Sequence, residues 1–132
     1  MIYLDAGVFL SAALDKGAKG KRARELLREV QGGKTPAATS ALTFDEVFWI
    51  VKKHRSFDDA LQASKALLEM PNLIFLEVND EVLWRSHALA EQYKLNPRDA
   101  IHAACALTHG IFTMVSEDED FDRVKEIERR NL

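Results

Sequence analysis

The sequence predicts an α/β fold, a single domain in which a short, mostly parallel sheet of four or five strands is flanked by helices on both faces. Short apolar runs alternate with longer segments whose apolar residues recur at helical spacing. This alternation is typical of parallel sheets whose strands are joined by crossover helices. The chain has 132 residues, 47% hydrophobic and 30% charged. That size and composition suit one globular domain over residues 1–132, with no internal repeat or linker.

Four segments are expected to form the strands. Each is short, rich in apolar residues, and bounded by turn or capping residues. The first of them is broken by an aspartate and a new apolar periodicity begins directly after it, which predicts a strand followed at once by a helix. In chain order the predicted strands are Ile2–Leu4, 35–39, 73–78 and 112–115.

Six segments are expected to form helices. The helix over 19–31 has an apolar stripe opposite its basic side chains, and the Gly32-Gly33 pair ends it. Ser40 is expected to cap the next helix, and Ser56 or Phe57 to begin the one after it. The predicted helices span 6–14, 19–31, 40 to about 54, 56 or 57 to 69, 80–92 and 96–109.

The sequence argues against membrane proteins and against proteins built on disulfides or thiolate-bound metals. The first apolar run is interrupted by Asp5 and lacks a basic flank, and no run approaches the roughly 20 apolar residues of a membrane span. We therefore expect a cytoplasmic protein with no membrane association. The single cysteine, Cys105, excludes an internal disulfide and a thiolate metal cluster, and its alanine-rich surroundings predict helix packing.

The net charge of −3 hides an uneven distribution of basic residues. They gather in segments 16–34, 52–55 and 123–130. A polyanionic partner is thus compatible with the acidic total, although charge alone favours the simpler interpretation that these are solvated helix faces.

Acidic residues stand at the junctions of the predicted elements. Asp5 follows the first strand, Glu46 lies inside the apolar run 42–51, and Asp99 opens an alanine-rich helix. Asp118 and Asp120 follow the apolar run 111–115. Ligands of parallel α/β sheets bind outside the carboxyl ends of the strands, so we expect these acids to meet on one rim. Carboxylates gathered there are costly without a cation, and the pattern predicts a metal site.

Several of these acids also have simpler structural explanations. Asp5 suits a helix N-cap, and Asp99 lies three residues after Asn96 in a pattern that resembles a capping box. Ser116 with Glu119 forms a second capping pattern.

Two neighbours of the acids are not expected to bind metal. Asp45, beside Glu46, is explained by the helix dipole and by pairing with Lys52 or Lys53. His102, three residues after Asp99, is expected to pack or to hydrogen-bond behind the ligands.

Taken together, the acidic motifs resemble the PIN-domain family of metal-dependent ribonucleases, especially the small single-domain toxins of the VapC type. The resemblance spans nearly the whole chain. Asp5, Glu46, Asp99 and Asp118 stand at the positions of the family's acidic residues, and Asp120 is the second aspartate of the last motif. The four motifs, in order, are IYLDAGVFL (2–10), SALTFDEV (40–47), LNPRDAIHAA (95–104) and SEDEDF (116–121). One departure is that Ala6 and Gly7 stand where the family usually has Ser or Thr and then Asn or Ser.

The resemblance implies Mg²⁺- or Mn²⁺-dependent hydrolysis of RNA phosphodiester bonds. It implies that Asp5, Asp99 and Asp118 bind the metal, that Glu46 is a ligand directly or through water, and that Asp120 completes the site. Oxygen ligands of this kind suit hard cations that retain several waters. The catalytic residues would be Asp5, Glu46, Asp99 and Asp118. The resemblance further implies a homodimer inhibited by a small antitoxin protein.

Two other functions compete with this one. A PIN-like module that binds RNA or a protein without cleavage is compatible with Ala6 and Gly7, which lack the family's usual polar side chains. Phosphoryl transfer with Asp5 as the nucleophile is disfavoured, because Gly7 stands where a haloacid-dehalogenase-like pattern has its second aspartate.

Overall fold

The computed structural model describes residues 1–132 and contains five strands, six α-helices and one 3₁₀ helix. The predicted α/β fold class is confirmed, and the sheet is parallel throughout. None of the helices is both long enough and apolar enough to span a membrane. In chain order the elements are β1 (Ile2–Leu4), α1 (Ala6–Leu14), α2 (Ala18–Gln31), β2 (Ala37–Ser40), α3 (Ala41–His54), α4 (Phe57–Leu68), β3 (Leu73–Leu76), α5 (Asp80–Tyr93), α6 (Pro97–Thr108), β4 (Thr113–Val115), η1 (Glu119–Arg123) and β5 (Glu128–Arg130).

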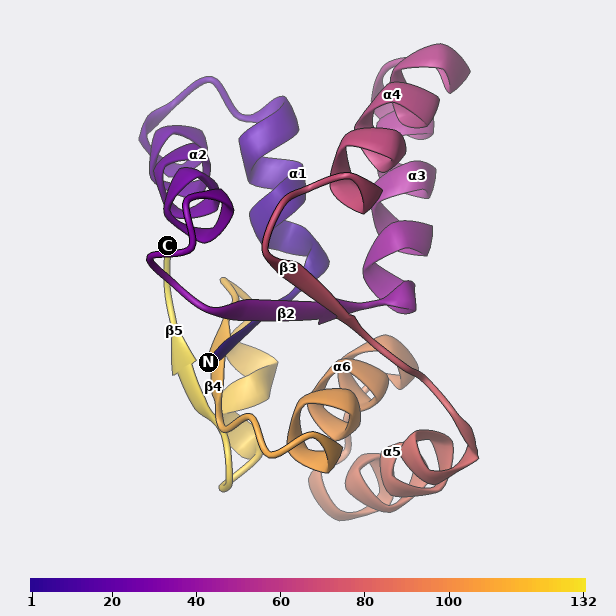
Figure 1. Cartoon of the computed structure of the whole chain (residues 1–132). Coiled ribbons are helices and arrows are strands. Elements are labelled where there is room, and N and C mark those ends of the chain that lie inside the picture. Colours follow the sequence, from indigo (N-terminus) through magenta and orange to yellow (C-terminus); the bar gives the residue numbers. More distant parts are fainter.

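The strands are arranged in the order β3-β2-β1-β4-β5, with β1 at the centre. The chain moves outward from β1 to β2 and β3, and then crosses back to place β4 on the other side of β1 (Figure 1). The strand order therefore reverses between β1 and β4. In open parallel sheets the crevice at such a reversal, beyond the carboxyl ends of the strands, is the usual place for a ligand.

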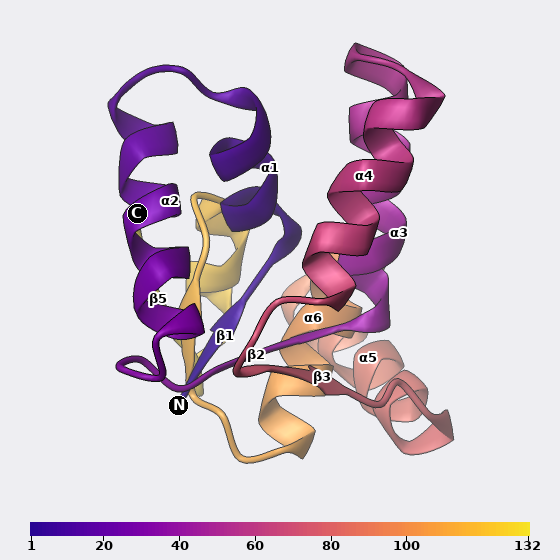
Figure 2. The same ribbon diagram turned by 45° about the horizontal axis from the view of Figure 1, so that its top comes forward.

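Helices cover both faces of the sheet, as predicted. Figures 1 and 2 show α1 to α4 on one side and α5 with α6 on the other. Successive side chains of each strand enter different cores, because side chains alternate along a strand. Tyr3, Ala38 and Met114 pack with α5 and α6. Their neighbours Leu4, Ala37 and Val115 pack with α1 to α4.

The predicted elements are all present, with shifted ends. The second strand begins at residue 37 instead of 35, and the strand expected over 73–78 ends at residue 76. Neither η1 nor β5 was assigned from the sequence, because β5 is a charged triplet with no apolar run to announce it. It forms by pairing with β4 at the edge of the sheet.

The capping predictions have mixed outcomes. Ser56 caps α4 as expected, since its side chain accepts a hydrogen bond from the Asp59 amide. Ser40 stands at the N-cap position of α3 but does not cap it, and the prediction was wrong in this respect. Its hydroxyl instead accepts a hydrogen bond from the buried Tyr3 side chain, at 2.9 Å. The Ser40 hydroxyl is thus used in a tertiary contact instead of the helix cap that the local sequence predicted.

Candidate metal centre

The predicted acids lie where the sheet reverses its strand order. Asp5 directly follows β1, and the segment 116–120 directly follows β4, its parallel neighbour. Helix α6 contributes Asp99 from its first turn, and α3 contributes Glu46. Four segments that are far apart in sequence thus bring five acids to one edge of the sheet, and Asp5 and Glu46 lie outside the close group that the other three form.

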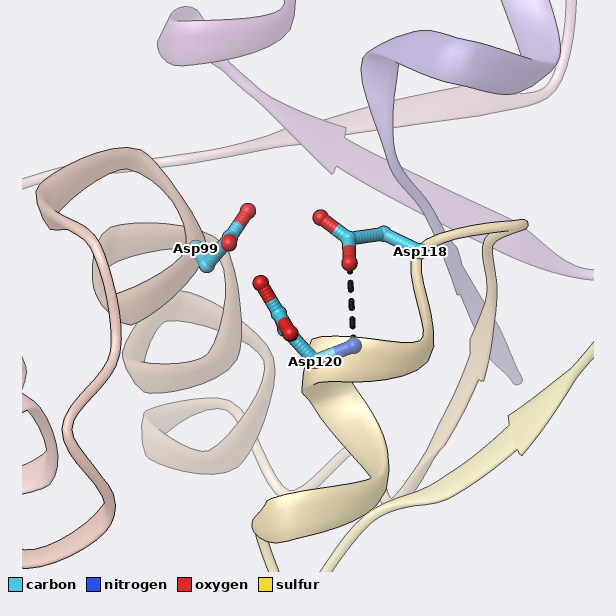
Figure 3. A group of neighbouring side chains, drawn as sticks. All are labelled: Asp99, Asp118 and Asp120. Atoms are coloured by element: carbon cyan, nitrogen blue, oxygen red, sulfur yellow. Dashed lines mark hydrogen bonds between the residues drawn. The ribbon is translucent and has the colours of Figure 1, made fainter.

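Three of the acids form a close cluster, which we call the acid cluster: Asp99, Asp118 and Asp120. One carboxylate oxygen from each lies within 4.8 Å of the other two (Figure 3). Figure 3 shows the Asp99 side chain reaching from α6 toward the other two, which stand on the turn into η1. The donor set consists entirely of carboxylate oxygens, the ligand type that fits Mg²⁺ or Mn²⁺.

Asp99 has no hydrogen-bond partner in the protein. The capping-box interpretation of this residue was therefore wrong, and Asn96 likewise makes no side-chain capping bond, although Pro97 occupies the first helical turn as expected. Burial, followed by the nearby charges of Asp118 and Asp120, raises the pKa of Asp99 to about 6. A carboxylate that is partly buried, unpaired and repelled by its neighbours fits a site for a cation.

Asp5 is buried, and both of its oxygens have partners. Oδ1 accepts a hydrogen bond from the Gly7 amide at 2.9 Å, so the N-cap interpretation is correct. Oδ2 accepts a hydrogen bond from the Ser116 hydroxyl. Burial raises the pKa of Asp5 against the opposing effect of the Ser116 bond. A carboxylate oxygen has more than one lone pair, so capping leaves Asp5 able to bind a cation as well.

Gly7 gives room to Asp5. A Cβ atom at this position would lie 3.1 Å from Asp5 Oδ1, closer than side chains normally approach. Gly7 therefore has no polar side chain to offer the site, but its backbone N–H lies in close contact with the Asp5 carboxylate.

Ser116 links the two halves of the site. Its hydroxyl donates to Asp5 and accepts from the Asp118 amide at 3.0 Å. The N-cap of η1 is Asp118, which accepts from the Asp120 amide at 2.9 Å. The capping box expected between Ser116 and Glu119 is therefore absent, and Ser116 serves instead as the bridge between the ends of β1 and β4.

Glu46 faces inward and Asp45 is exposed, as the surrounding sequence predicted, but the expected pairing of Asp45 with Lys52 or Lys53 is absent. Glu46 Oε1 lies 2.7 Å from the Nε2 atom of His102, whose side chain is 3% exposed. The expectation that His102 hydrogen-bonds behind the acids is confirmed. The charge of Glu46 contributes to raising the pKa of both Asp5 and Asp99, as expected for acids that face a common region.

Comparison with known proteins decides the family. The model of the PIN domain matches residues 2–127, nearly the whole chain. The chain belongs to the PIN domain family. No curated protein sequence matches it significantly.

Solved structures share the fold of this PIN domain at low sequence identity. VapBC2 from Rickettsia felis, bound to a DNA fragment from its promoter, has a TM-score of 0.74 and 20% identity over 99% of this chain and 98% of that one. VapC20 from Mycobacterium tuberculosis, a toxin that cleaves the sarcin-ricin loop, has a TM-score of 0.75 and 16% identity over 95% of each chain. A toxin-antitoxin complex from Klebsiella pneumoniae has a TM-score of 0.69 and 22% identity over 97% and 96%.

Arg129 fastens the loop that carries Asp118 and Asp120 in this PIN domain. Its guanidinium donates to the Ser116 carbonyl at 3.0 Å, where the loop begins. It also donates to both oxygens of Asp122, at 2.8 and 3.1 Å, two residues after Asp120. Sequence reasoning treated Arg129 as part of a basic surface, because nothing local indicates that β5 will pair beside this loop.

Replacing Arg129 with glutamine is expected to loosen this loop without unfolding the domain. Amide hydrogen exchange over residues 116–122 should accelerate about tenfold, as expected from losing about 1.5 kcal/mol of charged hydrogen bonding. Arg130→Gln is the matched control, since Arg130 pairs only with Glu128, on its own strand. Equal exchange in the two variants would contradict a fastening role for Arg129.

Proposed function

We propose that this PIN domain is a Mg²⁺- or Mn²⁺-dependent endoribonuclease and the toxin of a toxin-antitoxin pair that acts in the cytoplasm. The observation that carries the proposal is the acid cluster, whose oxygens lie within 4.8 Å of one another beside the reversal in strand order. The fold-level likeness to a toxin that cleaves the sarcin-ricin loop supports RNA as the substrate class.

Each acid has a separate task in this proposal. Asp5, Asp99 and Asp118 hold the metal, Glu46 is a ligand directly or through water, and Asp120 completes the site. When bound, such an ion makes its water more acidic, orients the scissile phosphate and neutralises charge on the leaving oxygen. The mutual repulsion of the acids keeps them poised for a cation, because nothing else in the protein bonds to Asp99.

Two cationic side chains pair with acids in the segment 117–120. Arg123 pairs with Asp120 at 3.2 Å and donates to the Lys94 carbonyl at 3.1 Å, which steadies the outer acid. Lys19 lies 3.9 Å from Glu117, so the basic start of α2 comes close to the acidic loop.

RNA contacts are proposed for the basic residues of segments 16–34 and 52–55. Two arginines are exceptions. Arg24 donates to the carbonyls of Ala12 and Asp15, at 3.1 and 2.9 Å, and so joins α1 to α2, and Arg22 donates to the Leu132 carbonyl at 2.9 Å. The remaining lysines and arginines are proposed to contact phosphates, which would make RNA affinity fall as salt concentration rises.

A homodimer and a small antitoxin are the proposed protein partners. Large apolar side chains are exposed on α3 and α4, and such exposure often marks a protein contact. They are Trp49, Phe57, Leu61 and Leu68, each between 46% and 56% exposed. Light scattering of the purified chain, alone and with a candidate antitoxin, tests both partners.

The activity itself is tested with the purified chain, free of any bound antitoxin. Structured RNAs, including one with a sarcin-ricin loop, should be cleaved in Mg²⁺ or Mn²⁺ and remain intact in EDTA. RNA that is bound but not cut in either metal would support the rival binding module. Neither binding nor cleavage across these RNAs would contradict the proposed substrate class.

Acidification is expected to weaken metal binding. A ligand must be deprotonated to bind a cation, and the pKa of Asp99 is about 6. Mn²⁺ affinity measured by calorimetry should therefore vary little between pH 8 and 7 and be about tenfold lower at pH 5, where Asp99 holds a proton. Affinity that is unchanged between pH 7 and 5 would contradict the combination of a raised pKa and metal ligation at Asp99.

A further inference from the structure

A chain of hydrogen bonds runs through the core and ends at Glu46. The Tyr3 hydroxyl donates to Ser40 Oγ at 2.9 Å and lies 2.7 Å from His102 Nδ1. At the other side of the imidazole, His102 Nε2 lies 2.7 Å from Glu46 Oε1. The chain links β2, β1, α6 and α3, four elements that surround the proposed site.

The Tyr3 and His102 side chains in this hydrogen-bond chain cannot rotate freely. Tyr3 is 0% and His102 is 2% exposed. Their rings meet edge to face, with centroids 5.6 Å apart and planes inclined by 67°. Because both ring nitrogens of His102 have partners, the imidazole has one settled orientation. The single Tyr3 proton goes to Ser40, so Nδ1 donates to the Tyr3 oxygen, and with both ring nitrogens protonated Nε2 donates to an ionised Glu46.

The same helix delivers both His102 and an acid of the cluster. His102 follows Asp99 by three residues, so the two side chains share one face of α6. The proximity of His102 lowers the pKa of Asp99 and of Asp5, against the larger effect of burial. Glu46 uses only Oε1 in the protein, and its Oε2 makes no hydrogen bond.

We propose that His102 is a positioning residue: anchored at Nδ1 by Tyr3, it holds Glu46 through Nε2 and leaves Oε2 available to a cation or to its water. This inference rests on the proposed function and adds residues to it. A histidine that merely filled the core would need hydrogen-bond partners too, but it would have no effect on metal binding beyond an effect on stability.

Two substitutions separate the ends of the imidazole. In His102→Gln the side-chain amide can reach the position of Nε2 and keep the bond to Glu46. In His102→Asn the shorter amide can reach the position of Nδ1 and keep the bond to Tyr3 only. Residues behind metal ligands contribute about 10- to 100-fold to metal affinity, so Mn²⁺ affinity should fall about tenfold or more in His102→Asn and stay within about threefold of wild type in His102→Gln.

Both variants are measured by calorimetry, with thermal unfolding in EDTA to register damage common to the two. Affinities that are equal in the two variants, whether both normal or both weak, would overturn the proposal. Asp118→Asn separates this failure from failure of the metal site itself. If Asp118→Asn leaves Mn²⁺ binding intact, the proposed function fails. If it removes binding while His102→Asn does not, only the role of His102 fails.

The wild-type protein gives a test that needs no substitution. In nitrogen-15 NMR of labelled histidine, Mg²⁺ should shift the ring signals of His102, because a cation at Glu46 draws charge from the acceptor of the Nε2 bond. His109 is the internal control, since its Nδ1 lies 2.8 Å from the Cys105 carbonyl, at the far end of α6. Binding of Mg²⁺ without movement of the His102 signals would overturn the proposal even if a variant fails to fold.

Discussion

Asp118→Asn is expected to lower metal-dependent RNA cleavage by on the order of 10³-fold while leaving the fold unchanged. Asp118 is exposed, and its one structural task is to accept the Asp120 amide hydrogen bond at 2.9 Å. The Oδ1 atom of asparagine can accept that bond equally well, whereas the charge that attracts the cation is lost. Single-turnover cleavage in Mn²⁺, with thermal unfolding measured in EDTA, tests both halves of the expectation.

Asp99→Asn should cause a similar loss of cleavage but should also stabilise the metal-free protein. The raised pKa of Asp99 means that the folded protein binds this proton more tightly than the unfolded chain does. Asp99 therefore lowers the stability of the wild type as pH rises from about 4 through 6, and this contribution is absent from the variant. Above pH 7 the variant should be more stable by on the order of 1 kcal/mol, since solvent screens part of the repulsion.

Asp45→Asn is the matched control for both variants. Asp45 is exposed on α3 next to Glu46 and makes no hydrogen bond or ion pair in the protein. Its replacement removes the same charge from the same region and should change neither cleavage nor stability. Cleavage by Asp118→Asn and Asp99→Asn at the rate of Asp45→Asn would exclude the acid cluster as the metal site.

The sequence was sufficient to predict the fold class because most of the decisive signals are local. The apolar runs gave four of the five strands, and helical periodicity gave all six helices. The strand β5 carries no such signal, since Glu128–Arg130 is charged and becomes a strand only by pairing with β4. Edge pairing depends on the rest of the sheet already being in place.

The candidate site was predictable to the level of residue type and order, but its local interactions were not. The sequence around Asp99 and around Ser116 matches a capping pattern as well as the sequence of many real helix caps does. In the structure Asp99 bonds to nothing and Ser116 bonds to Asp5 across 111 positions of sequence. The supporting contacts of Tyr3 and Arg129 are likewise long-range, and no spacing along the chain encodes them.

Substitutions of Asp5 test the proposed metal site most directly, because Asp5 has a structural role in the molecule and a separate, proposed role in catalysis. The side chain caps α1 through the Gly7 amide and receives the hydroxyl of Ser116, which is 1% exposed. Asp5→Ala removes both bonds. It should lower the free energy of unfolding by about 2–3 kcal/mol, about 1 from the cap and the rest from the buried Ser116 hydroxyl proton, which loses its acceptor.

Asp5→Asn separates the two roles. Its Oδ1 atom can still cap α1, so urea denaturation should show a loss of about 1 kcal/mol or less. If Asp5 binds the metal, RNA cleavage should nevertheless fall by on the order of 10²–10³-fold, because a neutral amide replaces the buried carboxylate. If Asp5 only caps the helix, Asp5→Asn should cleave like the wild type, and Asp5→Ala should lose activity only in proportion to its unfolded fraction. A stable Asp5→Asn variant with full activity would therefore remove Asp5 from the ligand set and leave Ser116 with a purely structural partner.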